Sequence, residues 1–153
     1  MFVYSQMEQI RKTYYKAYKD ALNKELVQEN FDWICKLHKE IVVRLCALIP
    51  RRTDLHDTIA GNMDPVIFKQ MLENKCYKPE DFVQLIEYVY DWIGKLCAPA
   101  RDEEVHATKE ALYKAMQDGQ TFGQLVPEFI FNVHEHLDAI EEDKRAFLKV
   151  YKK

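Results

Sequence analysis

Glycine and proline are scarce in this chain, which has four glycines and five prolines among 153 residues. So few turn-forming residues argue against a β-sandwich or barrel, which needs many turns. Hydrophobic residues make up 48% of the chain, too large a share for a disordered tail. No stretch approaches the ~20 apolar residues of a membrane-spanning helix, and the N-terminus lacks the pattern of a signal peptide. We therefore expect an intracellular, cytoplasmic protein with no integral membrane association.

Charge and cysteine spacing exclude further classes. The 22 basic and 25 acidic residues leave a net charge of −3, which provides no general attraction to nucleic acid, so no nucleic-acid partner is expected. No two cysteines have the Cys-x-x-Cys spacing of redox or zinc motifs. We expect the four thiols to be reduced and mostly buried; they are Cys35, Cys46, Cys76 and Cys97.

Apolar residues recur every three or four positions along most of the chain, whereas strand-like alternation is almost absent. The sequence predicts an all-α fold, in which residues 1–153 form a single-domain bundle of six or seven helices. Capping and stop residues place these helices at about 5–24, 30–50, 53–61, 64–74, 79–97, 102–118 and 121–147. The long apolar stripes of 30–50 and 79–97 predict that these two helices are central.

Three helix ends carry specific predictions. Ser5 and Glu8 have the spacing of a capping box, and Gly61 is expected to end its helix as a left-handed signal. Pro127 leaves two possibilities: the last helix kinks there or its regular part begins there, and we expect the second. The predicted inward face of the first helix consists of Met7, Ile10, Tyr14, Ala17 and Ala21.

Two histidine patterns resemble metal sites but are incomplete. Glu103 and His106 have the Glu-x-x-His spacing of dinuclear carboxylate sites, which require a second such pair on another helix, and the sequence has none. His134 and His136 point to different sides of a helix, so they cannot share a metal; His134 is expected to be partly buried and hydrogen-bonded. A metal-dependent enzyme is therefore the least favoured interpretation.

Cys35 and His38 are three residues apart on a predicted helix, which can place a thiol beside an imidazole. No glycine-rich loop for an oxyanion and no evident orienting carboxylate accompanies them, so packing explains them better. Phosphate-binding loops and nucleophile elbows are also absent from the sequence. We expect no catalytic residue, no metal, no cofactor and no enzymatic activity.

Three of the six arginines closely follow a proline that stops a helix, and an acid that can cap the next helix comes after them. A guanidinium at such a junction either crosslinks helix ends or forms a surface patch that recognises an acidic peptide or helix. Both interpretations remain open at this level. The candidate junction residues are Arg51, Arg52, Asp54, Pro99, Arg101, Asp102 and Glu103.

The segment from Leu96 to Glu103, with the sequence Leu-Cys-Ala-Pro-Ala-Arg-Asp-Glu, resembles the junction motif of the t-complex 11 family. Other landmarks of that family occur upstream in the same order, namely Arg52 to Ile59, Met63-Asp64, Gln70 and Glu87 to Tyr90. The resemblance is good from about residue 40 to 105 and weaker to about 140. Since members of the family are usually much longer, the chain looks like a short or truncated member.

The resemblance implies a non-enzymatic helical regulator, because the family is linked to cyclic-AMP and protein kinase A signalling and, in animals, to sperm maturation and motility. A virus-encoded short relative that engages a host pathway is one form such a protein can take. We expect a module that binds a protein partner through the arginine junction or through an apolar groove. The alternative is a bundle that sequesters an amphipathic helix or a lipid in such a groove. The sequence predicts neither the partner's identity nor the oligomeric state.

Overall fold

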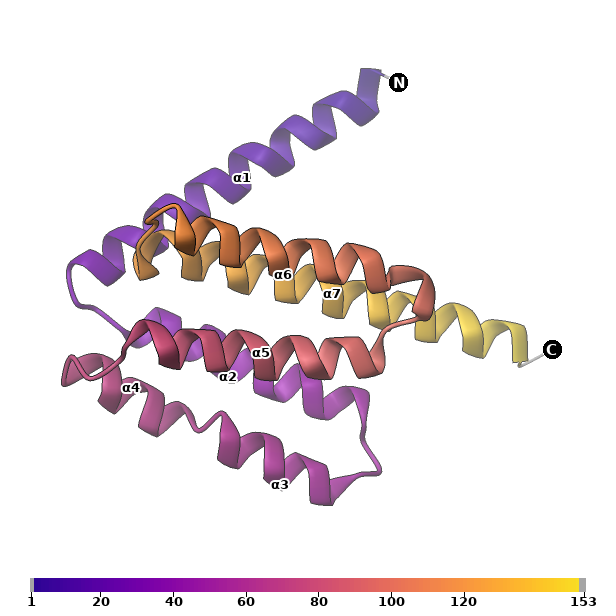
Figure 1. Ribbon diagram of the computed structural model, residues 1–153. Coiled ribbons are helices and arrows are strands. Elements are labelled where there is room, and N and C mark those ends of the chain that lie inside the picture. The colour runs from indigo at the N-terminus through magenta and orange to yellow at the C-terminus, as the bar shows by residue number, and fades with distance from the viewer. Residues whose placement is uncertain (1, 152–153) are drawn as a thin grey trace.

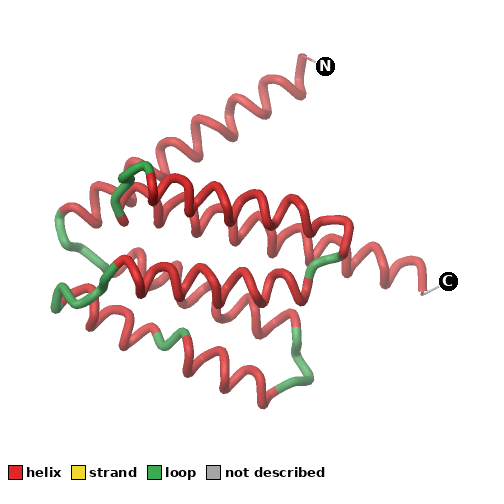
Figure 2. The backbone as a smooth tube through the Cα atoms, viewed as in Figure 1, coloured by secondary structure: helices red, strands yellow, loops and turns green. Residues whose placement is uncertain are grey.

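The computed structural model describes residues 2–151, and the side chains of residues 6–150. Within this range there are seven α-helices, one short 3₁₀ turn (η1) and no strand, which confirms the all-α prediction (Figure 1). The elements are α1 (Phe2–Val27), α2 (Asp32–Leu48), α3 (Thr53–Asn62), α4 (Pro65–Glu73), α5 (Pro79–Leu96), η1 (Pro99–Arg101), α6 (Asp102–Gln117) and α7 (Phe122–Tyr151). Short loops join them, most at the ends of the bundle, whereas the loop between α3 and α4 lies midway along it (Figure 2).

Helix α7 is the centre of the bundle, since it packs against α1, α2, α5 and α6. The helices α2 and α5, which were predicted to be central, both lie against α7, but the prediction missed that α7 itself contacts more of the bundle. Helices α3 and α4 lie on the outer side of α2, away from α7 (Figure 1). The central position of α7 follows from its length, because a helix of 30 residues is long enough to run along α1, α2, α5 and α6.

The predicted apolar stripes of α2, α5 and α7 form one hydrophobic core. Phe82 of α5 and Phe129 of α7 lie at its centre, with their rings edge to face at 5.6 Å between centroids. Each of these side chains is at most 2% exposed. The other side chains below 2% exposure include Ile34, Leu45, Ile59, Ile86, Ile93, Leu112, Leu125 and Leu137.

Helix α4 starts as its sequence predicts. Asp64 is the N-cap, and its Oδ1 accepts a hydrogen bond from the Val66 N–H at 2.9 Å, while Pro65 is the first helical residue. The end of α3 differs from the prediction, because Gly61 lies inside that helix, which ends at Asn62 without a left-handed residue. Gly119, just after α6, does adopt a positive φ of 91°, which glycine tolerates without steric cost.

The predicted inward face of α1 is exposed. Met7, Ile10 and Tyr14 are 65%, 65% and 78% exposed, and Ala17 and Ala21 are exposed as well. The face that packs on the bundle is one residue further along, at Tyr15, Tyr18, Leu22 and Leu26. The two faces are only ~100° apart and both follow the helical period, so periodicity cannot choose between them.

The N-terminal half of α1 projects beyond the bundle (Figure 1), whereas Leu22 and Leu26 in its C-terminal half are buried. The helix begins at Phe2 rather than at Ser5. The side chain of Ser5, and hence the predicted capping box with Glu8, lies outside the described residues.

Helix α7 passes through Pro127 and begins at Phe122, so the prediction that the regular helix starts at Pro127 is wrong. The turn before the proline is anchored at Thr121, whose carbonyl accepts from the Gln124 and Leu125 N–H groups at 3.0 Å each. The Thr121 N–H donates to Gln124 Oε1 at 2.9 Å. These bonds, and the burial of the proline ring, offset the hydrogen bond that Pro127 cannot donate to the preceding turn.

Candidate functional site

The first predicted arginine junction is the corner between α2 and α3. Arg52 donates two hydrogen bonds to Asp54, from Nε to Oδ1 at 3.0 Å and from Nη2 to Oδ2 at 2.9 Å, and both side chains are exposed. This hydrogen-bonded pairing lowers the pKa of Asp54 to about 2. Arg51 is exposed and has no ion-pair partner among residues 6–150.

The second junction is η1, at the corner between α5 and α6. Arg101 donates two hydrogen bonds to Asp143 of α7, from Nε to Oδ2 at 2.7 Å and from Nη2 to Oδ1 at 3.0 Å. The same pairing lowers the pKa of Asp143 below its usual range. Pro99 opens the turn, and Glu103 is exposed. Arg101 thus fixes the corner to the central helix.

Neither acid of the two junctions acts as the expected helix cap. The N-cap positions of α3 and α6 are held by Arg52 and Arg101, without a side-chain hydrogen bond to the helix start. Asp54 and Asp102 already lie inside their helices, where Asp102 Oδ1 accepts from Cys97 Sγ at 3.3 Å. At η1 the reason is local, because the 3₁₀ turn runs directly into α6 and supplies its first turn. Within the described residues, no hydrogen bond or ion pair joins the two corners to each other.

An arginine network that the sequence reasoning missed holds the acidic side of α7. Arg44 of α2 donates from Nη2 to Asp138 Oδ1 at 2.6 Å and to Glu141 Oε1 at 3.0 Å. Arg11 of α1 forms an ion pair with Glu135. Together with Arg101, these contacts clamp α7 from three separate elements. The available signal was a lone arginine within the apolar run of α2, and the distant acidic run at 141–143.

The same network fixes the protonation of His134. Arg44 Nη1 lies 2.9 Å from His134 Nδ1, and because a guanidinium only donates, Nδ1 must accept and the neutral ring carries its proton on Nε2. Burial, and then the Arg44 charge, lower the pKa of His134. His136 points to α6 instead, where its Nε2 lies 2.7 Å from Thr108 Oγ1. The expectations of a hydrogen-bonded His134 and of two diverging rings are confirmed.

The remaining chemical candidates do not assemble into a reactive site. Burial raises the pKa of the Cys35 thiol to about 11, which makes it a poor nucleophile. His38 is buried with its ring edge-on to Phe68, and its burial lowers its pKa to about 4. His106 Nε2 is 3.7 Å from Glu110 Oε1 on the exposed face of α6, and residues 6–150 contain no cluster of three potential metal ligands.

The four cysteines are free thiols, as expected, but the expectation that they are mostly buried is wrong. Cys76 is exposed and the other three are half-buried. Cys35, Cys46 and Cys97 lie against the edge of the core rather than inside it, where larger apolar side chains take the central positions.

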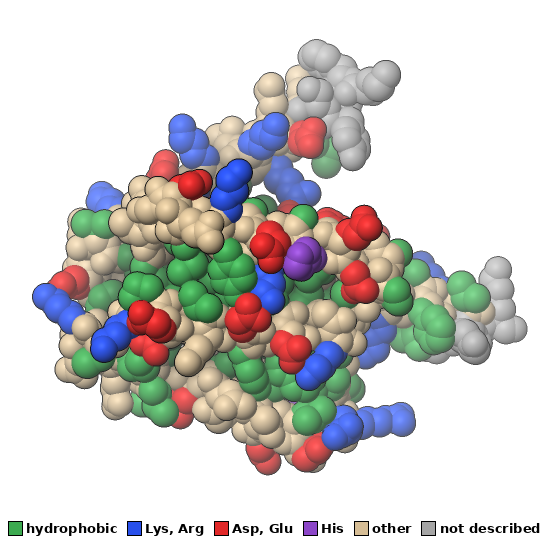
Figure 3. Space-filling model, in the orientation of Figure 1, with side chains coloured by type: hydrophobic (Ala, Val, Ile, Leu, Met, Phe, Trp, Pro, Cys, Tyr) green, Lys and Arg blue, Asp and Glu red, His purple; other side chains and the backbone are tan. Residues whose placement is uncertain are grey.

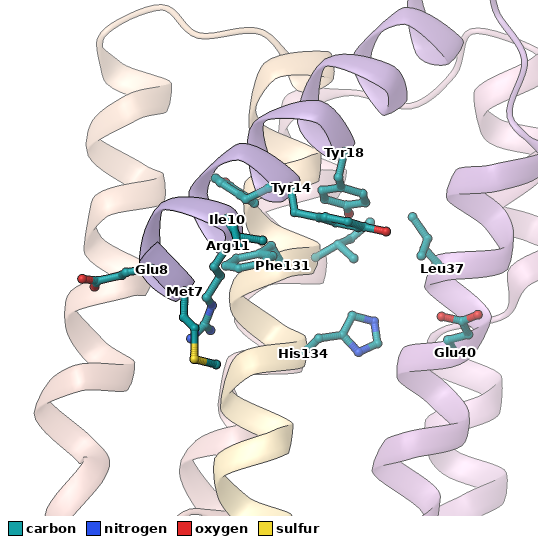
Figure 4. Close-up of a pocket in the computed structure, with 12 residues that line it drawn as sticks. Met7, Glu8, Ile10, Arg11, Tyr14, Tyr18, Leu37, Glu40, Phe131 and His134 are labelled. Atoms are coloured by element: carbon teal, nitrogen blue, oxygen red, sulfur yellow. The ribbon is translucent and has the colours of Figure 1, made fainter. Parts of the chain in front are cut away.

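A hollow of about 800 Å³ lies between the N-terminal half of α1 and the helices α2 and α7 (Figure 4). We call it the α1 hollow. Its α1 wall is formed by the exposed side chains that the sequence assigned to the core, and the ring of Tyr15 packs against Phe131 at 4.2 Å between centroids to close one side. The principal lining residues are Met7, Ile10 and Tyr14 of α1, Leu37 and Glu40 of α2, and Phe131 and His134 of α7.

The walls of the α1 hollow are mainly apolar, with few charges. Its charged lining residues are Glu8, Arg11 and Glu40, and Arg11 is already paired with Glu135. Glu40 faces His134 across the hollow (Figure 4), and neither Glu8 nor Glu40 has an ion-pair partner in the described part of the chain. The volume falls in the range of ligand and peptide sites, so apolar groups from another molecule fit this surface.

The visible outer face of the bundle carries acidic and basic side chains interspersed, with no field of one sign (Figure 3). None of the described helices is long and apolar enough to cross a membrane.

Comparison with known proteins identifies the chain's relatives. The family model described as T-complex protein 11 matches residues 2–143, a longer range than the sequence landmarks indicated. The human T-complex protein 11 homolog is 33% identical over 101 residues, which cover 63% of this chain and 19% of the human protein. The matched part therefore spans about a fifth of that relative. No solved structure matches the chain.

Proposed function

Because the chain belongs to the T-complex protein 11 family, we propose that it is a non-enzymatic, cytoplasmic module that binds a protein partner and thereby modulates signalling. The partner contributes an amphipathic helix, which lies in the α1 hollow. The observation that carries this proposal is the exposed apolar stripe of α1, which forms a wall of the hollow.

The stripe has the features of a helix-binding surface. Met7, Ile10 and Tyr14 are each at least 65% exposed and follow the i, i+3, i+7 spacing of one helix face. They are contiguous with the apolar side chains of α2 and α7 across the hollow. Large contiguous apolar surface is unfavourable in water and typically marks an interaction site. A helix that lays its apolar face into such a groove is a recurrent recognition mode.

The arginine corners support recognition less well than the hollow does. Arg52 and Arg101 already donate bidentate hydrogen bonds to Asp54 and Asp143. An acidic peptide would have to replace these internal partners, and of the three corner arginines only Arg51 has no ion pair with the described side chains. We therefore assign the corners a structural role and the hollow the binding role.

A neutral helical peptide tests the binding role. The probe is a fluorescently labelled peptide of about four turns, with leucine along one face and glutamine and alanine elsewhere. Fluorescence anisotropy should show saturable binding that weakens about tenfold in the Met7→Ser and Ile10→Ser variants. Val66→Ser is the matched control, because Val66 is 63% exposed but lies on α4.

Equal binding by Ile10→Ser and by the unchanged chain would contradict the proposal. Saturable binding of a fluorescent fatty acid, without binding of the peptide, would instead support the lipid-sequestering alternative.

The link to cyclic-AMP and protein kinase A signalling rests on the family. If the partner is protein kinase A, adding the chain to the purified holoenzyme should change the cyclic-AMP concentration that gives half-maximal kinase activity. The Ile10→Ser variant should lose this effect. An unchanged activation curve would remove protein kinase A as the direct partner.

A further inference from the structure

We infer that a second copy of this chain occupies the α1 hollow with the N-terminal half of its own α1, so that the protein forms a two-fold symmetric dimer. This inference rests on the proposed function, because both require that the hollow receives an amphipathic helix. The occupant is present in every copy, and its apolar face is exposed.

The projecting half of α1 is itself a basic amphipathic helix. Its apolar stripe is Met7, Ile10 and Tyr14. Between residues 6 and 19 it carries four cations, Arg11, Lys12, Lys16 and Lys19, against a single acid, Glu8. Lys12 and Lys16 are exposed and form no ion pair with any described side chain. This segment therefore brings apolar surface and positive charge together.

The hollow has the complementary charge. Once Arg11 is paired with Glu135, the charged lining that remains is Glu8 and Glu40, both negative. The lysines of α1 are not among the residues that line the hollow. A basic helix that approaches the hollow is thus attracted by two acids that have no ion pair among the described residues, so its approach is favoured by charge as well as by apolar contact.

An antiparallel arrangement of the two α1 segments brings their apolar stripes together. If the two-fold axis passes near Ile10, the Ile10 side chains of the two copies meet, because two-fold symmetry places a residue on the axis opposite its own copy. In the same register, Met7 lies opposite residue 13 of the second copy, one position from Tyr14. Because α1 is both a wall of the hollow and its occupant, the contact is made twice and closes the assembly as an isologous dimer.

One other exposed apolar segment is a competing occupant. Leu148 and Val150, near the end of α7, are 45% and 73% exposed. If the end of α7 entered the hollow of the next copy, the contact would join two different surfaces and give rings or open chains rather than a closed pair. The mass of the assembly therefore distinguishes the two arrangements.

Sedimentation equilibrium over a micromolar concentration range tests the inference. We expect a reversible dimer, with twice the mass of the 18.2 kDa chain. Ile10→Ser and Glu40→Lys should each weaken the dimer about tenfold, and Asp57→Lys, on the exposed face of α3, should leave it unchanged. Glu40→Lys combined with Lys12→Glu and Lys16→Glu should recover at least part of the lost affinity, because the swapped charges attract again. Circular dichroism confirms that each variant is folded.

A chain that stays monomeric throughout the range overturns the inference, as does a dimer insensitive to both Ile10→Ser and Glu40→Lys, or assemblies larger than two. The neutral peptide of the previous section separates the two claims. If the chain is monomeric but binds that peptide through Ile10, the dimer is wrong and the proposed function stands. If the peptide does not bind and the chain stays monomeric, both are wrong.

Discussion

At the scale of single residues, arginine is the side chain that fixes one element to another. Arg44 contacts three residues of α7, and Arg101 holds Asp143 through two parallel hydrogen bonds. A planar guanidinium can make such fixed multiple contacts, whereas a lysine ammonium is a single point of charge. The prolines and arginines of the junctions are visible in the sequence, but their partners, up to 97 positions away, are not.

The two arginine corners should respond differently to charge reversal. Arg101→Glu should lower the melting temperature, because Asp143 loses its partner and meets a like charge. Arg51→Glu should leave the melting temperature unchanged, since Arg51 has no ion pair with the described residues. Thermal melts followed by circular dichroism compare the two variants, and equal losses in both would contradict a structural role specific to Arg101.

His38 should make stability depend on pH. Burial disfavours the charged ring and lowers the pKa of His38 from its ordinary value of 6.5 to about 4 in the folded protein. Between pH 4 and pH 6.5 the unfolded chain therefore binds more protons than the folded protein. The contribution of the neutral His38 side chain to stability is complete above pH 6.5 and is lost as the pH falls toward 4. The full loss is about 3 kcal/mol.

Urea unfolding of the unchanged chain and of His38→Leu, at several pH values, measures this dependence. The difference between the two free energies of unfolding should grow as the pH falls through that window. Parallel curves would show that His38 does not titrate as its burial implies.

At the scale of elements, the sequence determines which segments are helical better than which face is buried. The buried faces of α2 and α5 were predicted correctly, because these helices carry too many apolar residues to leave them exposed. In α1 two faces compete, and the choice depends on a neighbour, α7, that lies more than 100 positions away. The predicted start of the last helix at Pro127 was wrong for a similar reason, since tertiary packing stabilises a helix around a proline that local preference would exclude.

The same ambiguity between the two faces of α1 is the reason that the sequence did not predict the α1 hollow. Met7, Ile10 and Tyr14 have the composition of a core face, and periodicity does not separate a face that packs within its own chain from one that awaits another molecule. The junction motif at 96–103, in contrast, indicated the family correctly, because a short string of defined residue types is specific without any knowledge of contacts.

The two halves of α1 should differ in local stability. Amides between residues 7 and 14 lie on the projecting half, whereas those from 18 to 26 belong to the half whose Leu22 and Leu26 are buried. In hydrogen exchange at concentrations too low for self-association, the first group should exchange about a hundredfold faster. Uniform protection along α1 would contradict a projecting half that lacks packing support.

At the scale of the whole molecule, α7 joins the other helices into one core, so unfolding should be cooperative. Phe129 is 1% exposed and its ring lies near those of Phe82 and Tyr90. Phe129→Ala should lower the free energy of unfolding by about 3–5 kcal/mol, because it removes a buried ring from the centre of this core.

Two tryptophans report on this cooperativity. Trp33 lies on α2 and Trp92 on α5, both packed against the core. Variants that retain only one of them should give coincident denaturant transitions, and Phe129→Ala should shift both equally. Separate transitions would show that the helices do not share one cooperative core.

The central claim is that the α1 hollow receives an amphipathic helix from another chain. Chemical-shift mapping tests it most directly, by following the amides of the ¹⁵N-labelled chain as the neutral helical peptide is added. The shifts should concentrate at Ile10, Leu37, Phe131 and His134, the residues of the three walls. Shifts centred instead on Arg51 and Arg101, or no shifts at all, would contradict it.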